Sequence, residues 1–114
     1  MKRTHTCGEL TKKDIGKEVV LCGWAHSRRD HGGLIFVDLR DRYGITQIVI
    51  NAQDVVGAGR GLPLHKLASS IRSEYVLAIN GKVEARPAGT ENKKIATGEI
   101  EVAVGGLQIV NASK

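Results

Sequence analysis

Phe36 is the single phenylalanine of the chain, and its position among charged residues favours a surface role. In the stretch 34–40 it shares one strand face with Asp38 and Arg40. The residues that alternate on the opposite, apolar face are Ile35, Val37 and Leu39. An aromatic ring on a polar face can stack on an unpaired base, a contact of about 1–3 kcal/mol. Two alternatives stay open: the ring packs beneath a loop, or the strand register is shifted by one residue.

Gln47 interrupts the apolar stretch 45–50, and its amide can both donate to and accept from a base edge. A polar residue of an edge strand that faces water would give the same pattern. The arginines nearby in the sequence are Arg28, Arg29, Arg40 and Arg42. As a set they would follow a phosphate backbone, whereas each alone is typical of a solvated or salt-bridged surface, because aspartates are interleaved with them.

Patterns for metal binding, nucleotide binding or catalysis are incomplete in this sequence. His26 and His31 have no further ligands at metal-binding spacing, so we expect no metal site. The glycine-rich stretch 57–61 lacks the lysine and hydroxyl residue that end a P-loop, so a flexible loop over 52–62 is the better interpretation. Without a nucleophile and base pattern, we expect no catalytic residues in this chain.

The charge and the cysteine count narrow the class of protein. The formal net charge of +5 favours a polyanionic partner such as nucleic acid or an acidic membrane surface. Cys7 and Cys22 form neither a CxxC pair nor a dense disulfide framework, which favours reduced thiols. The start of the chain has no signal-like apolar core and no apolar run is long enough to cross a bilayer, so we expect a cytoplasmic protein with no membrane partner.

The hydrophobic pattern predicts a single domain over 1–114, without internal repeats or a linker. Strands are predicted at 17–29, 34–39, 45–50, 75–86 and 99–104, with a last strand piece at 107–110. Gly23 marks a bend or bulge, and Gly44 closes a hairpin after Asp41. A short helix starts at Pro63 and ends near Ile71. This order predicts an all-β, five-stranded OB-fold Greek-key barrel with one short helix between strands three and four, and a mixed α+β sheet is the alternative.

The strand predicted at 75–86 is expected to be half-buried. The residues expected to point into the core are Tyr75, Leu77, Ile79, Val83 and Ala85, and those expected to point outward are Asn80, Lys82, Glu84 and Arg86. In the stretch 99–104 the inward set is Ile100, Val102 and Val104, which leaves Glu101 on the outer face.

Four stretches of the sequence resemble the N-terminal anticodon-binding domain of bacterial-type aspartyl-tRNA synthetase, a class II enzyme. They are RTHTCGEL at 3–10, LCGWAHSRRDHGGLIFVDLRDRYGITQIV at 21–49, IRSEYVLAINGKVEAR at 71–86 and ATGEIEV at 96–102. The block RRDHGGLIFVDLRDRYG is specific to that family rather than to OB-folds in general. The resemblance implies that the chain binds the anticodon loop of tRNA(Asp), whose anticodon is GUC.

The resemblance also implies residue roles in reading the first two anticodon bases. Phe36 would stack on the central uracil and Gln47 would bond its edge, with Arg29 contacting the loop nearby. Glu101 would accept from the N–H donors of the first-base guanine. Glu84 stands where many relatives carry arginine, so one backbone contact is expected to be missing.

For the third base, the resemblance implies that Arg86 and Asn92 border it. His31 resembles relatives that also charge tRNA(Asn), sometimes with a glycine in the later loop, as at Gly89. We therefore predict relaxed discrimination at the third base, because the GUC and GUU anticodons differ only there.

The family enzyme is a homodimer that uses ATP and Mg²⁺ in a catalytic domain following this region, and no signature of that domain occurs within the chain. The chain is thus expected to bind RNA without cofactors and without catalysis. Three rivals remain: a general single-stranded nucleic-acid-binding OB protein, a protein-interaction OB module, and the corresponding domain of a lysine- or asparagine-specific relative.

Overall fold

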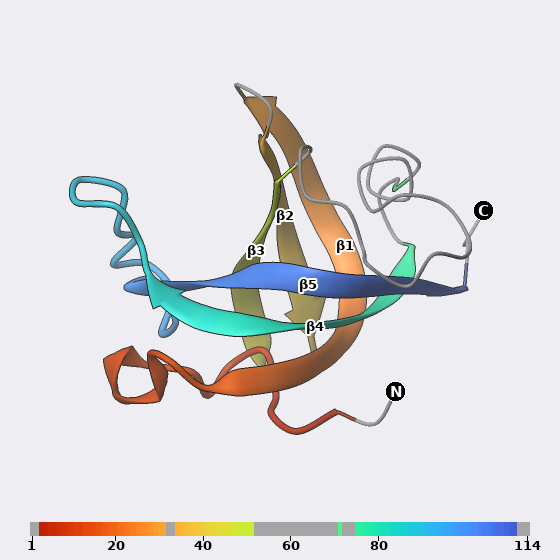
Figure 1. Cartoon of the computed structure of the whole chain (residues 1–114), viewed down its shortest axis with the longest axis horizontal. Coiled ribbons are helices and arrows are strands. Elements are labelled where there is room, and N and C mark those ends of the chain that lie inside the picture. The colour runs from red at the N-terminus through yellow and green to blue at the C-terminus, as the bar shows by residue number, and fades with distance from the viewer. Residues whose placement is uncertain (1–2, 32–33, 52–70, 72–74, 112–114) are drawn as a thin grey trace.

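The computed structural model describes residues 3–31, 34–51, 71 and 75–111 of the chain (Figure 1). The strands are β1 (Glu18–His31), β2 (Leu34–Asp41), β3 (Gly44–Asn51), β4 (Val76–Ala85) and β5 (Ile100–Asn111), preceded by a 3-10 turn, η1 (Lys12–Asp14). They close into a barrel in the order β1-β2-β3-β5-β4. The predicted all-β, five-stranded barrel is confirmed.

One strand serves both halves of the barrel. The first part of β1, through Trp24, pairs antiparallel with β4, and the part from Trp24 onward pairs antiparallel with β2. Gly23 lies at this changeover, where a Cβ atom would come within 2.4 Å of the Arg40 carbonyl oxygen, so only glycine allows so close an approach. The register shift in β1 lies between Ala25 and Ser27, just after the bend that Gly23 predicts.

The end of the sheet differs from the prediction in one respect. The two predicted pieces at 99–104 and 107–110 form one strand, β5, in which Gly105 is skipped in the pairing with β4. A bulge of this kind lets a strand bend without ending. The last strand is therefore continuous from Ile100 to Asn111 and pairs with β4 along its whole length.

The core lies inside the barrel and follows the predicted alternation on most strands. The fully buried large side chains are Leu10, Val19, Leu21, Val37, Leu39, Ile48, Ile50, Ile71, Leu77, Ile79 and Ile100. The predicted helix over 63–71, apart from Ile71, and the predicted loop over 52–62 lie outside the described residues. Burial of Ile71 places its side chain in the core cluster.

The burial predicted at the end of β4 is wrong. Ala85 is exposed, and Arg86, which was predicted to point outward, is only 9% exposed. The strand ends at Ala85, and a proline follows at position 87, so strand alternation no longer decides where these side chains point. The Arg86 side chain is buried on the outer side of the barrel, against the connection between β4 and β5, where it donates hydrogen bonds to the Ile100 and Thr90 carbonyls.

Candidate nucleic-acid interface

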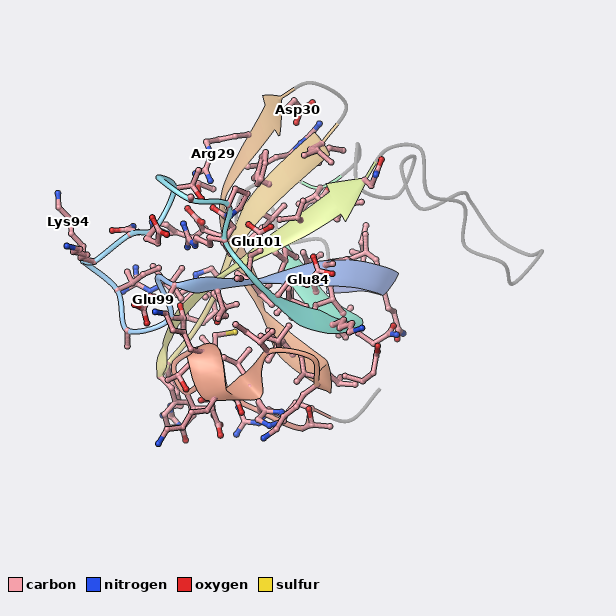
Figure 2. The ribbon with its side chains drawn as sticks, turned by 60° about the vertical axis from the view of Figure 1, so that its left-hand side comes forward. Arg29, Asp30, Glu84, Lys94, Glu99 and Glu101 are labelled. Atoms are coloured by element: carbon pink, nitrogen blue, oxygen red, sulfur yellow. The ribbon has the colours of Figure 1, made fainter. Side chains whose placement is uncertain are left out.

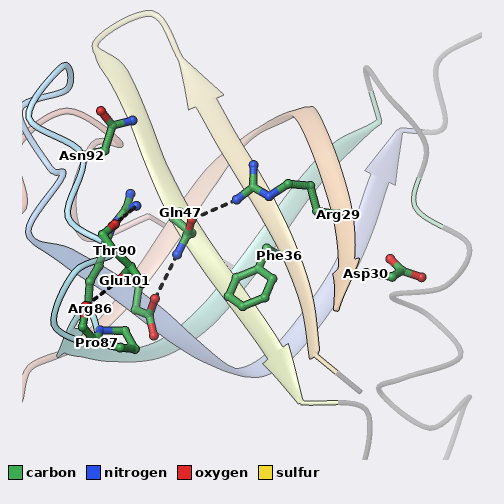
Figure 3. A pocket seen from close by; sticks show the side chains of 9 residues that line it. All are labelled: Arg29, Asp30, Phe36, Gln47, Arg86, Pro87, Thr90, Asn92 and Glu101. Carbon is green, nitrogen blue, oxygen red and sulfur yellow. Dashed lines mark hydrogen bonds between the residues drawn. The ribbon is translucent and has the colours of Figure 1, made fainter. Parts of the chain in front are cut away.

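A pocket of about 550 Å³ lies on the outer face of the barrel (Figure 3). Side chains from β1, β2, β3 and β5 and from the connection between β4 and β5 line it: Arg29, Asp30, Phe36, Gln47, Arg86, Pro87, Thr90, Asn92 and Glu101. We call this the anterior pocket. It brings together every residue to which the resemblance gives a role in reading the anticodon except His31, whose side chain lies outside the described part of the structure.

Phe36 occupies the position that its strand phase predicts. Ile35 and Val37 on either side of it are buried, whereas Phe36 is half-buried and lines the anterior pocket. The Arg29 guanidinium lies over its ring, with Cζ 5.8 Å from the ring centroid. The ring is therefore outside the core cluster, on the surface where a base can stack, and it already carries a cation–π contact.

Gln47 bridges two charged side chains. Its Oε1 accepts a hydrogen bond from Arg29 Nη2 at 3.0 Å, and its Nε2 donates to Glu101 Oε1 at 2.9 Å (Figure 3). The alternative of an edge-strand residue facing water is wrong, because β3 lies between β2 and β5 and Gln47 is only 6% exposed. Its two partners fix which way the amide points, and each end keeps one further hydrogen-bonding position.

Arg29 is held by a small polar network at the β1 edge of the pocket. Its Nη1 lies 3.4 Å from Asp38 Oδ2, and that same oxygen accepts a hydrogen bond from Ser27 Oγ at 2.7 Å. The Arg29 side chain is still about half exposed, at 53%. The guanidinium is thus oriented over Phe36 while part of it stays accessible to a ligand.

Glu101 is a half-buried carboxylate at the opposite side of the pocket. Burial raises the pKa of Glu101, against the hydrogen bond from Gln47 and the charge of Arg86, which both lower that pKa. Glu84 lies directly across from it in the β4–β5 register and also raises its pKa (Figure 2). A carboxylate held partly out of water is stabilised by hydrogen bonds from N–H donors, and a ligand can supply such donors.

The Arg86 guanidinium donates hydrogen bonds to backbone carbonyls in the wall of the pocket. Nε donates to the Ile100 carbonyl at 3.1 Å and Nη1 donates to the Thr90 carbonyl at 3.2 Å. Burial lowers the pKa of Arg86, whereas the charges of Glu101 and Asp38 raise it. The side chain therefore anchors the connection between β4 and β5 against the start of β5.

Asn92 is exposed in this connection, and the backbone around it is folded back on itself. Its N–H donates to the Gly98 carbonyl at 2.9 Å, and its Oδ1 accepts from the Lys94 N–H at 3.0 Å. A Cβ on Gly98 would lie 1.6 Å from the Asn92 carbonyl oxygen, so no other residue fits there. The glycine in ATGEIEV thus sets the position of Asn92.

Three lining residues were not predicted: Asp30, Pro87 and Thr90. Asp30 follows Arg29 directly and could have been included by adjacency, but the polar turn at 87–90 gave no periodic signal. Among the four arginines, only Arg29 lines the anterior pocket. Arg28 instead pairs with Asp30 at 2.8 Å and donates to the Ile71 carbonyl at 3.2 Å, so it supports the barrel.

The described residues contain no group of three or more histidine, cysteine, aspartate or glutamate side chains placed to hold a metal ion. Cys7 and Cys22 are both free thiols. Within the same described ranges, no helix has the length and apolar character needed to cross a membrane.

A closed five-stranded barrel whose outer face presents an aromatic ring, an amide and a carboxylate is the arrangement of an oligonucleotide-binding OB domain. The tRNA anti-codon family model, described as an OB-fold nucleic acid binding domain, matches residues 19–110. The chain belongs to this family.

Relatives at high identity cover the whole chain. It is 56% identical over 114 residues to the aspartate–tRNA(Asp/Asn) ligase of Desulfatibacillum aliphaticivorans, and 58% identical over 113 residues to that of Geotalea uraniireducens (strain Rf4). These alignments cover 100% and 99% of the chain but only 18% of each ligase. The chain thus spans less than a fifth of the length of these curated relatives.

Among solved structures, asparaginyl-tRNA synthetase from Pyrococcus horikoshii matches with a TM-score of 0.79 and 27% identity. The match covers 100% of this chain and 24% of that one. OBody AM2EP06, bound to hen egg-white lysozyme, also matches with a TM-score of 0.79 at 28% identity, and the match covers 99% of this chain and 97% of that one.

Proposed function

We propose that this chain is the anticodon-binding domain of a cytoplasmic aspartate–tRNA ligase and that the anterior pocket reads the anticodon loop of tRNA(Asp). The observation that carries the proposal is the Arg29–Gln47–Glu101 network beside Phe36, because it combines a stacking surface with oriented donors and acceptors in one pocket. The high identity to ligases for tRNA(Asp/Asn) supports the same assignment.

The middle base of the anticodon would be read by Phe36 and Gln47. A uracil stacked on Phe36 would present its edge toward β3, where Gln47 has a free position at each end of its amide. Uracil carries both an N–H donor and carbonyl acceptors, which suits such an amide. Arg29 would remain at the edge of the stack and contact the loop through its exposed side.

The first base, guanine, would be read by Glu101. Guanine offers two neighbouring N–H donors on its Watson–Crick edge, and a carboxylate has two acceptor oxygens. One oxygen of Glu101 already accepts from Gln47, so the reading of the first two bases is coupled through that hydrogen bond. A pyrimidine at this position would leave the partly buried carboxylate without these donors.

The third base would lie against the connection between β4 and β5, near Asn92, which follows by two residues the Thr90 carbonyl that accepts a hydrogen bond from Arg86. His31 would contribute from the end of β1. We propose that discrimination here is relaxed, so that tRNA(Asn) with GUU binds as well as tRNA(Asp) with GUC. The two ligases compared with the chain above are named for both tRNA(Asp) and tRNA(Asn), which supports this.

The remaining activity would belong to the parent enzyme. In it a catalytic domain would join aspartate to tRNA with ATP and Mg²⁺, as a homodimer, and this domain would select the tRNA without a cofactor of its own. A general single-stranded nucleic-acid-binding OB protein is the second candidate, since Phe36 alone would serve either role.

The test is a binding titration of the 114-residue chain with anticodon stem-loops carrying GUC, GUU and GCC. We expect similar Kd values for GUC and GUU. The Kd for GCC should be at least tenfold higher, which corresponds to about 1.4 kcal/mol of binding free energy. Phe36→Leu should weaken GUC binding by the loss of stacking, about 1–3 kcal/mol. Equal Kd values for all loops would favour the general single-strand binder, and a strong preference for GUC over GUU would refute relaxed third-base reading.

A further inference from the structure

A second pocket, of about 380 Å³, lies between the β2–β3 turn and the stretch 95–97. The side chains that define its character are Arg40, Arg42, Tyr43 and Ile95, with Thr97 at its floor. We call it the turn pocket. None of its residues was given a role in reading the anticodon bases.

The turn pocket continues the anterior pocket along the same strand face. Arg40 follows Phe36 and Asp38 on the outer side of β2, and its partner in the register is Ile45, two residues before Gln47. The register pairs Arg40–Ile45 and Asp38–Gln47 are therefore about 7 Å apart along the strands. The connection between β4 and β5 gives Thr90 and Asn92 to one pocket and the stretch 95–97 to the other.

The charge of the turn pocket is positive and not neutralised. Arg40 and Arg42 are exposed, and no carboxylate in the described part of the chain forms an ion pair with either. Asp41 between them is only 8% exposed, and its carboxylate accepts hydrogen bonds from the backbone N–H groups of Cys7, Tyr43 and Gly44. Asp41 Oδ2 also lies 4.0 Å from Arg3 Nη1, so the charge of Asp41 is compensated by these donors rather than by Arg40 or Arg42.

Tyr43 adds an aromatic surface to these charges. Tyr43 is 56% exposed, and Arg3 lies over its ring with Cζ 5.5 Å from the centroid. An exposed ring beside unpaired guanidinium groups is what single-stranded nucleic-acid grooves use to hold a strand without reading its sequence.

We propose that the turn pocket is a second RNA contact, which rests on the proposed function. Arg40 and Arg42 bind backbone phosphates of the nucleotides that flank the anticodon, and Tyr43 packs against the adjoining base. The continuity with the anterior pocket and the charge complementarity with RNA argue for this occupant. The contact adds affinity that is independent of the anticodon sequence, because phosphates carry no base identity.

The test compares the double variant Arg40→Gln/Arg42→Gln with wild type for the GUC stem-loop and a GCC stem-loop at several salt concentrations. Two lost phosphate contacts on a single strand should lower the slope of log K against log salt by about 1.4. Between about 50 and 200 mM salt the affinity of wild type should then fall about sevenfold more than that of the variant. Both stem-loops should be weakened by the same factor.

Two controls isolate the effect. Lys82→Gln removes an exposed positive charge on β4 that lines neither pocket, and it should leave the slope unchanged. The variant Arg40→Lys/Arg42→Lys keeps the positive charges and should retain most of the salt-dependence slope. Thermal midpoints show that the double variants fold. If the double Gln variant has the same salt-dependence slope as wild type and Lys82→Gln, the inference is overturned. The proposed function would still stand in that case, provided that wild type still discriminates between the GUC and GCC stem-loops. Absence of any stem-loop binding by wild type overturns the proposed function and this inference together.

Discussion

Gln47 donates a hydrogen bond to Glu101 at 2.9 Å, at the seam where the barrel closes. The parallel pairing of β3 with β5 begins at the very next residues, Ile48 with Val102. The same contact therefore helps to close the barrel and orients two side chains of the anterior pocket. Because one hydrogen bond has both tasks, changes at this pair should alter stability and RNA binding together.

Gln47→Glu should destabilise the chain at pH 7. The new carboxylate would face Glu101 at hydrogen-bonding distance and could no longer donate, which leaves a partly buried acceptor unsatisfied at a cost of about 1–3 kcal/mol. Lowering the pH should restore stability, because a protonated carboxyl donates again. Urea denaturation at pH 7 and pH 5 measures both effects. Gln108→Glu, on the exposed side of β5, is the matched control, and an equal loss in both variants would contradict the prediction.

Glu101→Gln should bind RNA poorly and yet be more stable than wild type near neutral pH. Since the pKa of Glu101 is raised above its ordinary value of 4.5 in the folded chain, the folded state binds more protons than the unfolded state in the window above 4.5. Wild-type stability therefore falls as the pH rises through that window, and the variant lacks this loss. Denaturation of both proteins at pH 4 and pH 7 gives the difference.

For the control, Glu18→Gln changes an exposed glutamate far from the pocket and should show the pH dependence of wild type. A wild type that gains stability relative to Glu101→Gln between pH 4 and pH 7 would run against the predicted sign. Stem-loop titration of Glu101→Gln should in addition show a weaker preference for guanine at the first anticodon position.

Arg86→Lys should destabilise the connection between β4 and β5 although the charge is kept. A lysine cannot reproduce the planar fork that serves the carbonyls of Ile100 and Thr90, and a lost hydrogen bond from a charged donor costs about 1.5–3 kcal/mol. Hydrogen exchange of the amides in 90–98 should accelerate. Arg42→Lys on the exposed turn is the comparison and should change stability by less than about 0.5 kcal/mol.

Gly98→Ala should disrupt the position of Asn92. The added methyl would overlap the Asn92 carbonyl oxygen, at 1.6 Å, so the stretch 92–98 must rearrange and lose its closing hydrogen bond. We expect a loss of about 1–3 kcal/mol and altered third-base selectivity. Gly105→Ala, whose Cβ would meet its nearest atom at 3.8 Å, should fold normally. Equal thermal midpoints for the two variants would count against this account.

Local periodicity was sufficient to predict the strands and the outward position of Phe36, because alternation on a half-buried strand depends only on neighbouring residues. It could not predict that Gln47 meets Glu101, since that contact arises from the long-range closure of β3 on β5. The burial of Arg86 has the same origin: its acceptors are two backbone carbonyls that the folded connection brings near. Thr90 carries one of them and gave no signal in sequence.

The order of strands has a consequence for synthesis. β5 comes last in chain order among the described strands of the barrel and lies between β3 and β4 (Figure 1). Until residues 100–111 have left the ribosome, β3 and β4 are unpaired edges of an open sheet, and Gln47 has no carboxylate partner. A nascent chain of this sequence therefore completes the anterior pocket in a single late step, when the barrel closes, and a ribosome paused before that point holds a sheet with two unpaired edges.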